Sequence, residues 1–159
     1  MPNRALDRVD RKILEQLQAD GRLTNQDLAE RVALSPSPCL RRVRALEKSG
    51  VIRRYVALID PAKVGLGLLA YVTVKLEKKG KMPVEQFSRS AQSWPEVVAC
   101  YSMTGDMDYL MRVQVADLDH YSRFVMDKLL KQPGVIDIKS NFILERIKDT
   151  TALPLDQLV

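Results

Sequence analysis

The sequence is poor in the residues that most metal and catalytic sites require. It has two cysteines, one histidine and one tryptophan among 159 residues. A single histidine disfavours a histidine-based catalytic triad and a site with several histidine ligands. Cys39 and Cys100 have neither the spacing of a zinc site nor that of a disulfide framework, as is usual in a reducing cytoplasm. We therefore predict no metal site, no cofactor and no catalytic residue.

Long hydrophobic runs are also missing. The N-terminus, MPNRALDRVDRK, carries charges throughout and lacks the apolar core of a secretory signal. The longest nearly apolar run, 64–74, is too short to span a bilayer. The sequence therefore predicts a cytoplasmic protein with no membrane partner.

Positive charge is concentrated in the first part of the chain. Residues 1–60 hold 12 basic and 8 acidic side chains, whereas residues 61–159 hold 13 and 12. A local excess of positive charge attracts a polyanion such as nucleic acid. We expect double-stranded DNA as the partner of the first part and a nearly neutral partner for the second.

The stretch 35–50, SPSPCLRRVRALEKSG, predicts a short basic helix. Ser37 is a good N-cap, Pro38 fits the first helical position, and Gly50 ends the helix. Apolar side chains at three-residue spacing predict a buried stripe of Leu40, Val43 and Leu46. The rest of the circumference is basic, with Arg41, Arg42, Arg44 and Lys48. Such a helix fits a DNA major groove, although a solvated surface helix has the same pattern in isolation.

The sequence before this helix favours the DNA-binding interpretation. Apolar residues at helical spacing follow Asp7, a plausible N-cap, and this first helix ends at Gly21. Thr24 caps a second helix with Asp27 three residues on. Its inner face comprises Leu28, Ala29 and Val32. Three short helices, the last two joined by a tight turn, are typical of a helix-turn-helix unit.

Beyond the basic helix, β-branched residues predict a strand at 51–59 that packs behind the helices. Arg53 and Arg54 on this strand would face the phosphates that flank the groove. Residues 1–60 are therefore predicted to form a winged helix-turn-helix domain, followed by a linker at 61–67.

Residues 68–146 alternate strand and helix patterns, which predicts a ferredoxin-like βαββαβ domain and an α+β fold. The expected strands are 68–77, 97–103, 109–115 and 135–144. A charged turn, 78–83, follows the first strand. The expected inward side chains of the two helices are Val84, Phe87, Ala91, Trp94, Leu118, Tyr121, Phe124, Val125 and Leu129. The tail, 147–159, shows no strong pattern.

This topology has a consequence for assembly. Two crossovers of the same hand place both helices on one face of the sheet. The strands are nevertheless apolar on both sides, as Leu69 and Tyr71 show beside Val72 and Val74. We expect a second copy to cover the open face, and the resulting homodimer would present two basic helices to a two-fold symmetric DNA site.

Three motifs resemble one family of regulators. LSPSPCLRRVRALEKSGVI is followed by IDPAKVG, and TGDMDYLMRV comes about forty residues later. This order resembles the leucine-responsive and asparagine regulator family (Lrp/AsnC) of bacterial and archaeal transcription factors. The resemblance implies a winged helix-turn-helix domain joined to a ferredoxin-like ligand domain. It also implies an amino-acid effector and homodimers that associate further, often to octamers.

The resemblance places the recognition helix at Ser37–Ser49. The residues that it puts closest to DNA are Ser35, Ser37, Pro38, Arg41, Arg42 and Arg44. Thr24 and Asn25, at the start of the preceding helix, are candidates for phosphate contacts through the N-terminal amides of that helix. We predict that Arg41 and Arg42 lie near bases. We predict phosphate contacts for Arg44, Lys48, Arg53 and Arg54.

The resemblance places the effector loop at 104–109. Asp106 and Asp108 can pair with an α-ammonium group, and backbone amides freed by Gly105 can bind an α-carboxylate. The other predicted effector residues are Met103, Thr104, Tyr109, Ile136 and Ser140, the last two from a neighbouring subunit. The methionines near the loop, which include Met107, favour an apolar amino acid such as leucine or methionine. The same residues also suit an ordinary hairpin turn.

Two alternatives differ in class from an effector-responsive regulator. One is a metabolic enzyme or small-molecule sensor, since some members of this superfamily act as haem-pathway decarboxylases. The intact basic helix and the scarcity of histidine speak against it. The other is an architectural DNA-binding protein with no effector, which would bind DNA identically with and without amino acids.

Overall fold

The computed structural model describes residues 5–77 and 82–157, so part of the predicted charged turn, 78–81, lies outside the described residues. The chain divides into two compact units. The first comprises Met1–Leu58 together with Lys148–Val159, and the second comprises Ile59–Ile147. The tail, which the sequence left as a separate segment, therefore belongs to the first unit.

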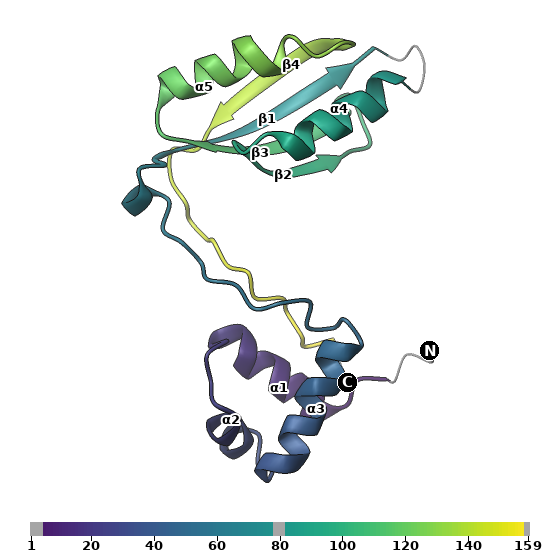
Figure 1. The fold of residues 1–159 in the computed structure, drawn as a ribbon, viewed down its shortest axis with the longest axis vertical. Coiled ribbons are helices and arrows are strands. Elements are labelled where there is room, and N and C mark those ends of the chain that lie inside the picture. Colours follow the sequence, from purple (N-terminus) through teal and green to yellow (C-terminus); the bar gives the residue numbers. More distant parts are fainter. Residues whose placement is uncertain (1–4, 78–81, 158–159) are drawn as a thin grey trace. The chain divides into compact units, whose positions relative to one another are not determined.

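The first unit contains three helices, as predicted: α1 (Arg8–Ala19), α2 (Asn25–Arg31) and α3 (Pro36–Lys48) (Figure 1). They enclose one apolar core, whose buried members are Ile13, Leu14, Leu28, Ala29, Val32, Cys39 and Leu46. The caps of the first two helices are those that the sequence predicts. Asp7 forms a capping box with Asp10, and the Thr24 hydroxyl accepts the N–H of Asp27.

The predicted start of α3 is wrong by two residues. The helix is capped at Ser35 and begins at Pro36, not at Ser37 and Pro38. The sequence repeats Ser-Pro, and a proline is tolerated anywhere in the first turn because the first N–H groups have no partner within the helix. The end of α3 is as expected, since Gly50 follows the C-cap with φ +77°.

The predicted inner stripe of α3 also needs correction. Leu40 is exposed, and Cys39 takes the buried position, followed by half-buried Val43 and buried Leu46. Positions 39, 43 and 46 follow the 3.6-residue period of an α-helix, whereas the predicted three-residue repeat does not. Cys39 is therefore a packing residue of the core.

The strand predicted at 51–59 is wrong: the structure assigns no strand to these described residues. The segment is extended and mostly exposed, and Ile52 alone of its apolar residues packs against the first core. A strand requires a neighbouring strand for its hydrogen-bonded ladder, and the structure assigns no other strand to the described part of this unit.

The second unit is a four-stranded antiparallel sheet in the order β2-β3-β1-β4, which is the predicted ferredoxin-like arrangement. Its elements in chain order are β1 (Leu68–Leu76), α4 (Met82–Ser93), β2 (Val97–Ser102), β3 (Tyr109–Val115), α5 (Leu118–Phe124) with its π-helical continuation η2 (Val125–Leu129), and β4 (Val135–Phe142). A short 3₁₀ turn, Ala62–Val64, precedes the sheet.

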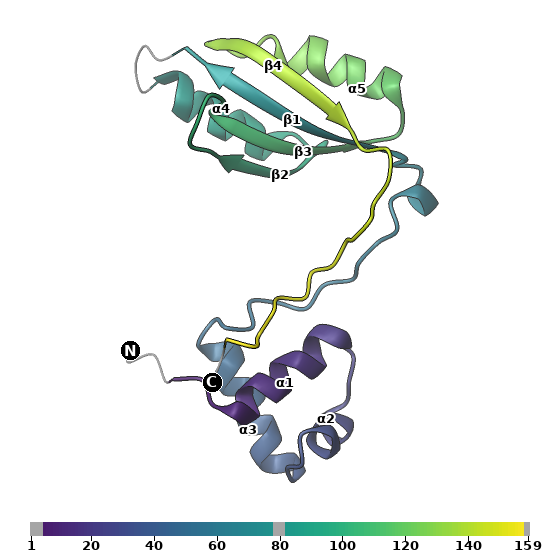
Figure 2. The ribbon, with the colours of Figure 1, turned by 180° about the vertical axis from the view of Figure 1, so that it is seen from behind.

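Both helices lie on one face of the sheet (Figure 1), while none of the described helices lies over the opposite face (Figure 2). The covered face carries alternate residues of β1 and β3, from Ala70 to Leu76 and from Tyr109 to Val115. Phe87, Ala91, Trp94, Tyr121, Phe124 and Leu129 pack on it from the helices, as predicted. Val84 and Leu118 were predicted to face inward and are instead 44% and 60% exposed, because each lies at the first turn of its helix, beyond the sheet.

Candidate functional site

The exposed side of α3 is the basic surface that the sequence predicts. Arg41, Arg44 and Lys48 are exposed there and form no ion pair with any described residue. Because the three lie at three- and four-residue spacing, they share one face of the helix. Unpaired cations on one helix face are the electrostatic requirement for binding a DNA backbone.

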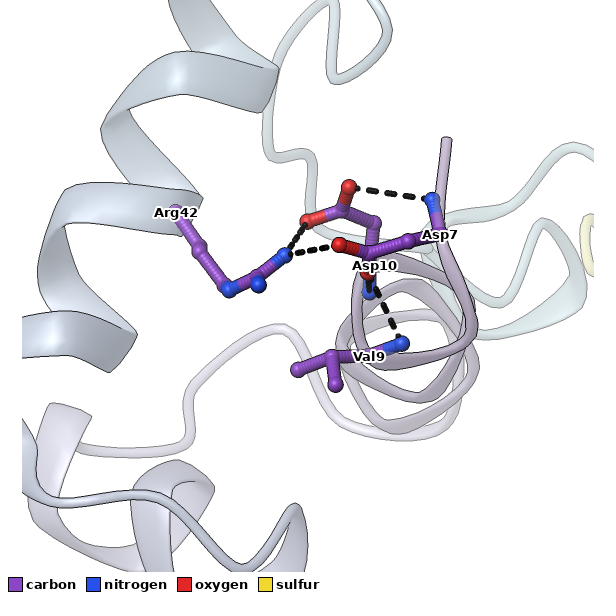
Figure 3. A network of polar contacts seen from close by, with 4 residues as sticks. All are labelled: Asp7, Val9, Asp10 and Arg42. Carbon is purple, nitrogen blue, oxygen red and sulfur yellow. Dashed lines mark hydrogen bonds and ion pairs between the residues drawn. The ribbon is translucent and has the colours of Figure 1, made fainter. Parts of the chain in front are cut away.

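Arg42 lies on a different side of α3 and is part of the protein's own framework (Figure 3). Its Nη1 donates to Oδ2 of Asp7 at 2.7 Å and to Oδ1 of Asp10 at 2.8 Å. The other Asp10 oxygen accepts the Asp7 backbone N–H at 3.2 Å, and Oδ1 of Asp7 accepts the N–H of Val9. Arg42 therefore joins the recognition helix to the capping box of α1, and the structure gives no support to its predicted place near bases.

Hydrogen bonds set the electrostatics of this network. The Asp10 side chain is only 3% exposed, and an unpaired carboxylate is costly at such a position. The backbone N–H of Asp10 and then the Arg42 guanidinium lower the pKa of Asp7 to about 2. Hydrogen bonds to the carboxylates of Asp7 and Asp10 raise the pKa of Arg42. Asp7 and Arg42 therefore both carry their charges at neutral pH.

The start of α2 is occupied by local contacts. The Thr24 hydroxyl accepts the Asp27 N–H and donates to its carboxylate at 2.7 Å. Asn25 donates from Nδ2 to the Pro36 carbonyl at 2.9 Å, which joins the beginnings of α2 and α3. The Asn25 side chain therefore links α2 to α3, and the predicted phosphate contact, which uses backbone amides at the start of α2, does not depend on it.

The remaining predicted DNA residues are accessible, with one exception. Ser35 and Ser37 are exposed, and the Ser35 hydroxyl makes no cap hydrogen bond, while Pro38 is half-buried. Arg53 and Arg54 are exposed in the extended segment that follows α3. These side chains extend the positive surface beyond the helix.

The predicted effector loop connects β2 and β3, and its backbone is held at both ends. Met103 donates its N–H to the Asp108 carbonyl at 2.8 Å, and Asp108 donates its own to the Val74 carbonyl at 3.0 Å. One Asp108 carboxylate oxygen accepts the Leu76 N–H at 2.7 Å. Asp108 therefore ends the ladder between β3 and β1 and has only part of its carboxylate available for a ligand.

Within the loop, Thr104, Gly105 and Asp106 are exposed, whereas Met103 and Met107 are half-buried. Gly105 has φ +114°, a conformation that L residues rarely adopt. The loop thus offers the exposed Asp106 carboxylate beside two methionine side chains, as an amino-acid site requires.

Tyr109 is turned away from the surface of the loop. Its ring is buried, the Tyr109 and Phe87 ring centroids lie 4.6 Å apart, and its hydroxyl hydrogen-bonds Ser88. Ser140 is exposed, and its hydroxyl accepts from the Tyr121 hydroxyl. Strand alternation places both residues in register with Val74 and Val72, on the helix-covered face. Ile136 is exposed.

A hollow of about 310 Å³ lies elsewhere in the second unit. It is lined by Asp60, Leu66, Leu69, Ile143, Glu145 and Arg146, among others. The register of β1 places it at the opposite end of this strand from the predicted loop, since Leu68 pairs with Val115 and Val74 with Tyr109. This hollow is therefore separate from the predicted effector loop.

The described residues contain neither a membrane-spanning helix nor a metal-binding cluster of side chains. No helix in this part of the chain is long and apolar enough to cross a membrane. In the same ranges, no group of three or more histidine, cysteine, aspartate or glutamate side chains could hold a metal ion.

Sequence reasoning missed two features: the anchoring of Arg42, and the docking of the tail on α1. The first had a signal, because Asp10 lies one turn before Ile13 on the apolar side of α1. A carboxylate among core positions requires a cationic or donor partner. The tail carried no comparable signal.

A capped helix-turn-helix unit with an exposed basic helix, joined to a ferredoxin-like unit, defines a two-domain DNA-binding regulator. Comparison with known families agrees: a winged helix-turn-helix DNA-binding model matches residues 6–53, and the Lrp/AsnC ligand binding domain matches residues 69–153. The chain belongs to the Lrp/AsnC family of transcriptional regulators.

Individual relatives resemble the chain over nearly its whole length. The leucine-responsive regulatory proteins of Escherichia coli K12 and Salmonella typhimurium are 40% identical over 152 residues, covering 96% of this chain and 93% of theirs. A transcriptional regulator from Neisseria meningitidis, solved in complex with L-methionine, is 50% identical with a TM-score of 0.95, covering 98% of this chain and 100% of the other. An AsnC family regulator from Agrobacterium tumefaciens is 44% identical, with a TM-score of 0.91 and coverages of 97% and 100%.

Proposed function

We propose that this protein is a sequence-specific regulator whose assembly and DNA affinity respond to an apolar amino acid, with methionine first and leucine second. The observation that carries the choice of effector is the complex of the Neisseria meningitidis regulator with L-methionine, at 50% identity. The half-buried Met103 and Met107 beside the loop are compatible with an unbranched or branched apolar side chain.

The proposed division of DNA contacts follows from exposure. Arg41 reads base edges, since it is exposed on the basic face of α3 and bound to no described carboxylate. Ser35, Ser37 and Pro38 accompany it at the start of the helix. The proposed phosphate contacts are Arg44, Lys48, Arg53 and Arg54. Thr24 and Asn25 stay in the phosphate group through the backbone amides at the start of α2. Arg42 is withdrawn because its side chain binds Asp7 and Asp10.

The proposed effector site is centred on the loop 104–108. Asp106 pairs with the α-ammonium group, and exposed backbone amides around Gly105 bind the α-carboxylate. Because this loop is open within one chain, a neighbouring subunit is needed to close the pocket, and exposed Ile136 is a candidate contribution. A ligand shared between subunits links effector binding to assembly.

The proposed assembly is a homodimer that associates further, to an octamer. Support comes from the uncovered face of the sheet (Figure 2). Strand register and alternation place half-buried Tyr71 and Leu110 and exposed Tyr101 on this face. A second copy removes this apolar surface from water. We also propose that this DNA-binding regulator acts in the cytoplasm and is not an enzyme.

The test is binding to the DNA upstream of the protein's own gene, measured over a salt series with and without each of the twenty amino acids. We expect a saturable complex that is selective over unrelated DNA, has a steep salt dependence, and changes affinity with methionine or leucine. Scrambled DNA of the same composition is the control for selectivity.

Three outcomes separate the readings. A shift in affinity with an apolar amino acid supports both the DNA surface and the effector. Selective binding that ignores all twenty amino acids identifies an architectural protein. Absence of selective binding favours the alternative of a small-molecule sensor or an enzyme.

A further inference from the structure

The C-terminal segment is held on α1 by a side chain that binds its backbone. Gln18 donates from Nε2 to the Leu153 carbonyl at 3.2 Å, and its Oε1 accepts the Leu153 N–H at 2.6 Å. An amide side chain that satisfies both backbone groups of one residue replaces the partner that a neighbouring strand would supply. The contact therefore recognises an extended chain regardless of its side chain, and Leu153 itself is 69% exposed.

Two further contacts fix the segment on either side of α1. Leu155 is half-buried and packs against the apolar core of the first unit. Nη2 of Arg11 donates to Oδ1 of Asp156 at 2.9 Å, while Nε of Arg11 is paired with Glu15 at 2.6 Å. A backbone clamp, an apolar anchor and an ion pair together give the segment one defined position.

Chain connectivity gives this docking a special place. Unit 2 is inserted between two parts of unit 1, so the chain passes between the units twice, after Leu58 and after Ile147. The second passage begins only five residues beyond the end of β4 at Phe142. A displacement of β4 therefore pulls on the C-terminal segment that α1 holds.

The contacts continue from α1 to the recognition helix. Arg11, which binds Asp156, is adjacent to Asp10. Asp10 and Asp7 in turn hold Arg42 of α3. An unbroken series of bonds therefore joins the end of the chain to the helix that reads DNA.

We propose that residues 148–157 form a clasp on α1, through which the ligand unit acts on the recognition helix. The proposal rests on the effector response proposed above. A single flexible connection leaves the DNA-binding unit free to reorient, whereas a second one restricts it. Exposed hydrogen bonds and ion pairs contribute little net stability, so docked and released clasps are close in free energy and a ligand can shift their balance.

The experiment compares two leucines of the clasp in the full-length protein. Leu155→Asp puts a charge in the apolar anchor, and Leu153→Asp makes the same change at an exposed position as the matched control. Hydrogen exchange of residues 150–157 reports docking. DNA affinity with and without L-methionine reports coupling.

For the wild type and Leu153→Asp we expect slow exchange in the clasp and the full methionine effect. For Leu155→Asp we expect exchange at least 10-fold faster, DNA affinity without methionine within about 3-fold of wild type, and loss of most of the methionine effect. Should this variant not fold, Gln18→Ala replaces it, since it removes only the clamp from the surface of α1.

Two results overturn the proposal. One is equally fast exchange in the wild type and Leu155→Asp, which shows that the clasp is not docked in solution. The other is a released clasp with the methionine effect intact. A wild-type protein that binds DNA selectively but responds to no amino acid refutes the proposed effector function and, with it, the coupling role of the clasp. If only the coupling role is wrong, the wild type responds to methionine and Leu155→Asp responds equally.

Discussion

Arg41 and Arg42 are neighbours in the sequence with different roles. Successive residues of a helix point about 100° apart, so only one of the two faces solvent on the basic side. Arg41 is exposed, whereas Arg42 binds Asp7 and a nearly completely buried Asp10. Residue type and spacing alone assign both to DNA, and the difference lies in which helix each one faces.

Replacement of Arg42 by alanine should lower the free energy of unfolding by about 2 kcal/mol, because Asp10 then loses the cation that offsets its burial. Urea unfolding measures the change. The matched control is Arg44→Ala on the exposed side of the same helix, which should alter stability by less than about 0.5 kcal/mol. Equal losses in the two variants would contradict the anchoring role.

Replacement of Arg41 by alanine should weaken selective DNA binding far more than non-selective binding. A bidentate contact from arginine to guanine discriminates between bases by about 1–3 kcal/mol. Titration of operator and scrambled DNA at one salt concentration measures both affinities. Arg44→Ala is the comparison, because loss of a phosphate contact weakens binding to both DNAs alike. The same uniform pattern in Arg41→Ala would move Arg41 to the phosphate group.

Asp7 gives the first unit a dependence on acid pH. Its pKa falls from 3.8 to about 2 on folding, chiefly through the Asp10 N–H and then Arg42. A lowered carboxyl pKa stabilises the folded state above the unfolded value, and this contribution is lost as the pH falls through the folded value. Between pH 4 and pH 2, the wild type should lose about 1 kcal/mol more stability than Asp7→Asn, a figure reduced for the partial exposure of Asp7. Urea unfolding at each pH measures the stability of both proteins. An equal loss of stability in the two proteins between pH 4 and pH 2 would contradict this role of Asp7.

At the scale of elements, the turn between α2 and α3 carries the helix-turn-helix geometry. Ala33 donates its N–H to the Glu30 carbonyl, and Leu34 donates to the Ala29 carbonyl. These two bonds form a Schellman motif with Ala33 in the left-handed position, at φ +56°. Glycine is the usual residue there, so the turn holds an alanine in an unfavourable conformation.

Ala33→Gly should therefore stabilise the first unit by about 0.5 kcal/mol, the relief of left-handed strain being partly offset by the greater freedom of glycine in the unfolded chain. Ala45→Gly is the matched control, since Ala45 is exposed within α3 and the same change there should cost about 1 kcal/mol. Thermal unfolding of both variants measures the difference in sign. A loss at both positions would show that the strain is negligible.

The extended segment 51–59 shows that a strand-like pattern of side chains does not by itself form a strand. Its β-branched residues suit a strand, and the predicted strand is nevertheless absent from the described chain. Side-chain pattern reports the preference of a segment, whereas a strand forms only with a hydrogen-bonding partner beside it. The four strands of the second unit form because each has such a partner.

At the scale of the whole molecule, the uncovered sheet face predicts the site of assembly. Tyr71→Asp places a charge at its centre, in register with Arg112 and Asn141. We expect analytical ultracentrifugation to show dissociation to smaller species with an unchanged circular dichroism spectrum. Leu118→Asp, at an exposed position of α5, is the control and should leave assembly intact. Dissociation by Leu118→Asp alone would place the interface on the helices instead.

Local signals in the sequence specify most of the elements and the fold class, although not the strand predicted at 51–59. Caps at Asp7 and Thr24, the glycine after α3 and the alternation along β1 are local signals, because each depends on residues within one turn or one strand. The order of strands and helices then left few topologies, and the ferredoxin-like sheet is the one observed.

Tertiary structure decided which side chains remain free to act. Arg42, Asn25, Tyr109 and Ser140 have residue types that suit a binding site, and each is bound to a partner far away in the sequence or at another element. The docking of the tail on α1 is of the same kind, since Gln18 and Leu153 are 135 residues apart. Such contacts depend on which surfaces the folded chain brings together. A local pattern can show that a partner is needed, as Asp10 among core positions does, but it does not identify that distant partner.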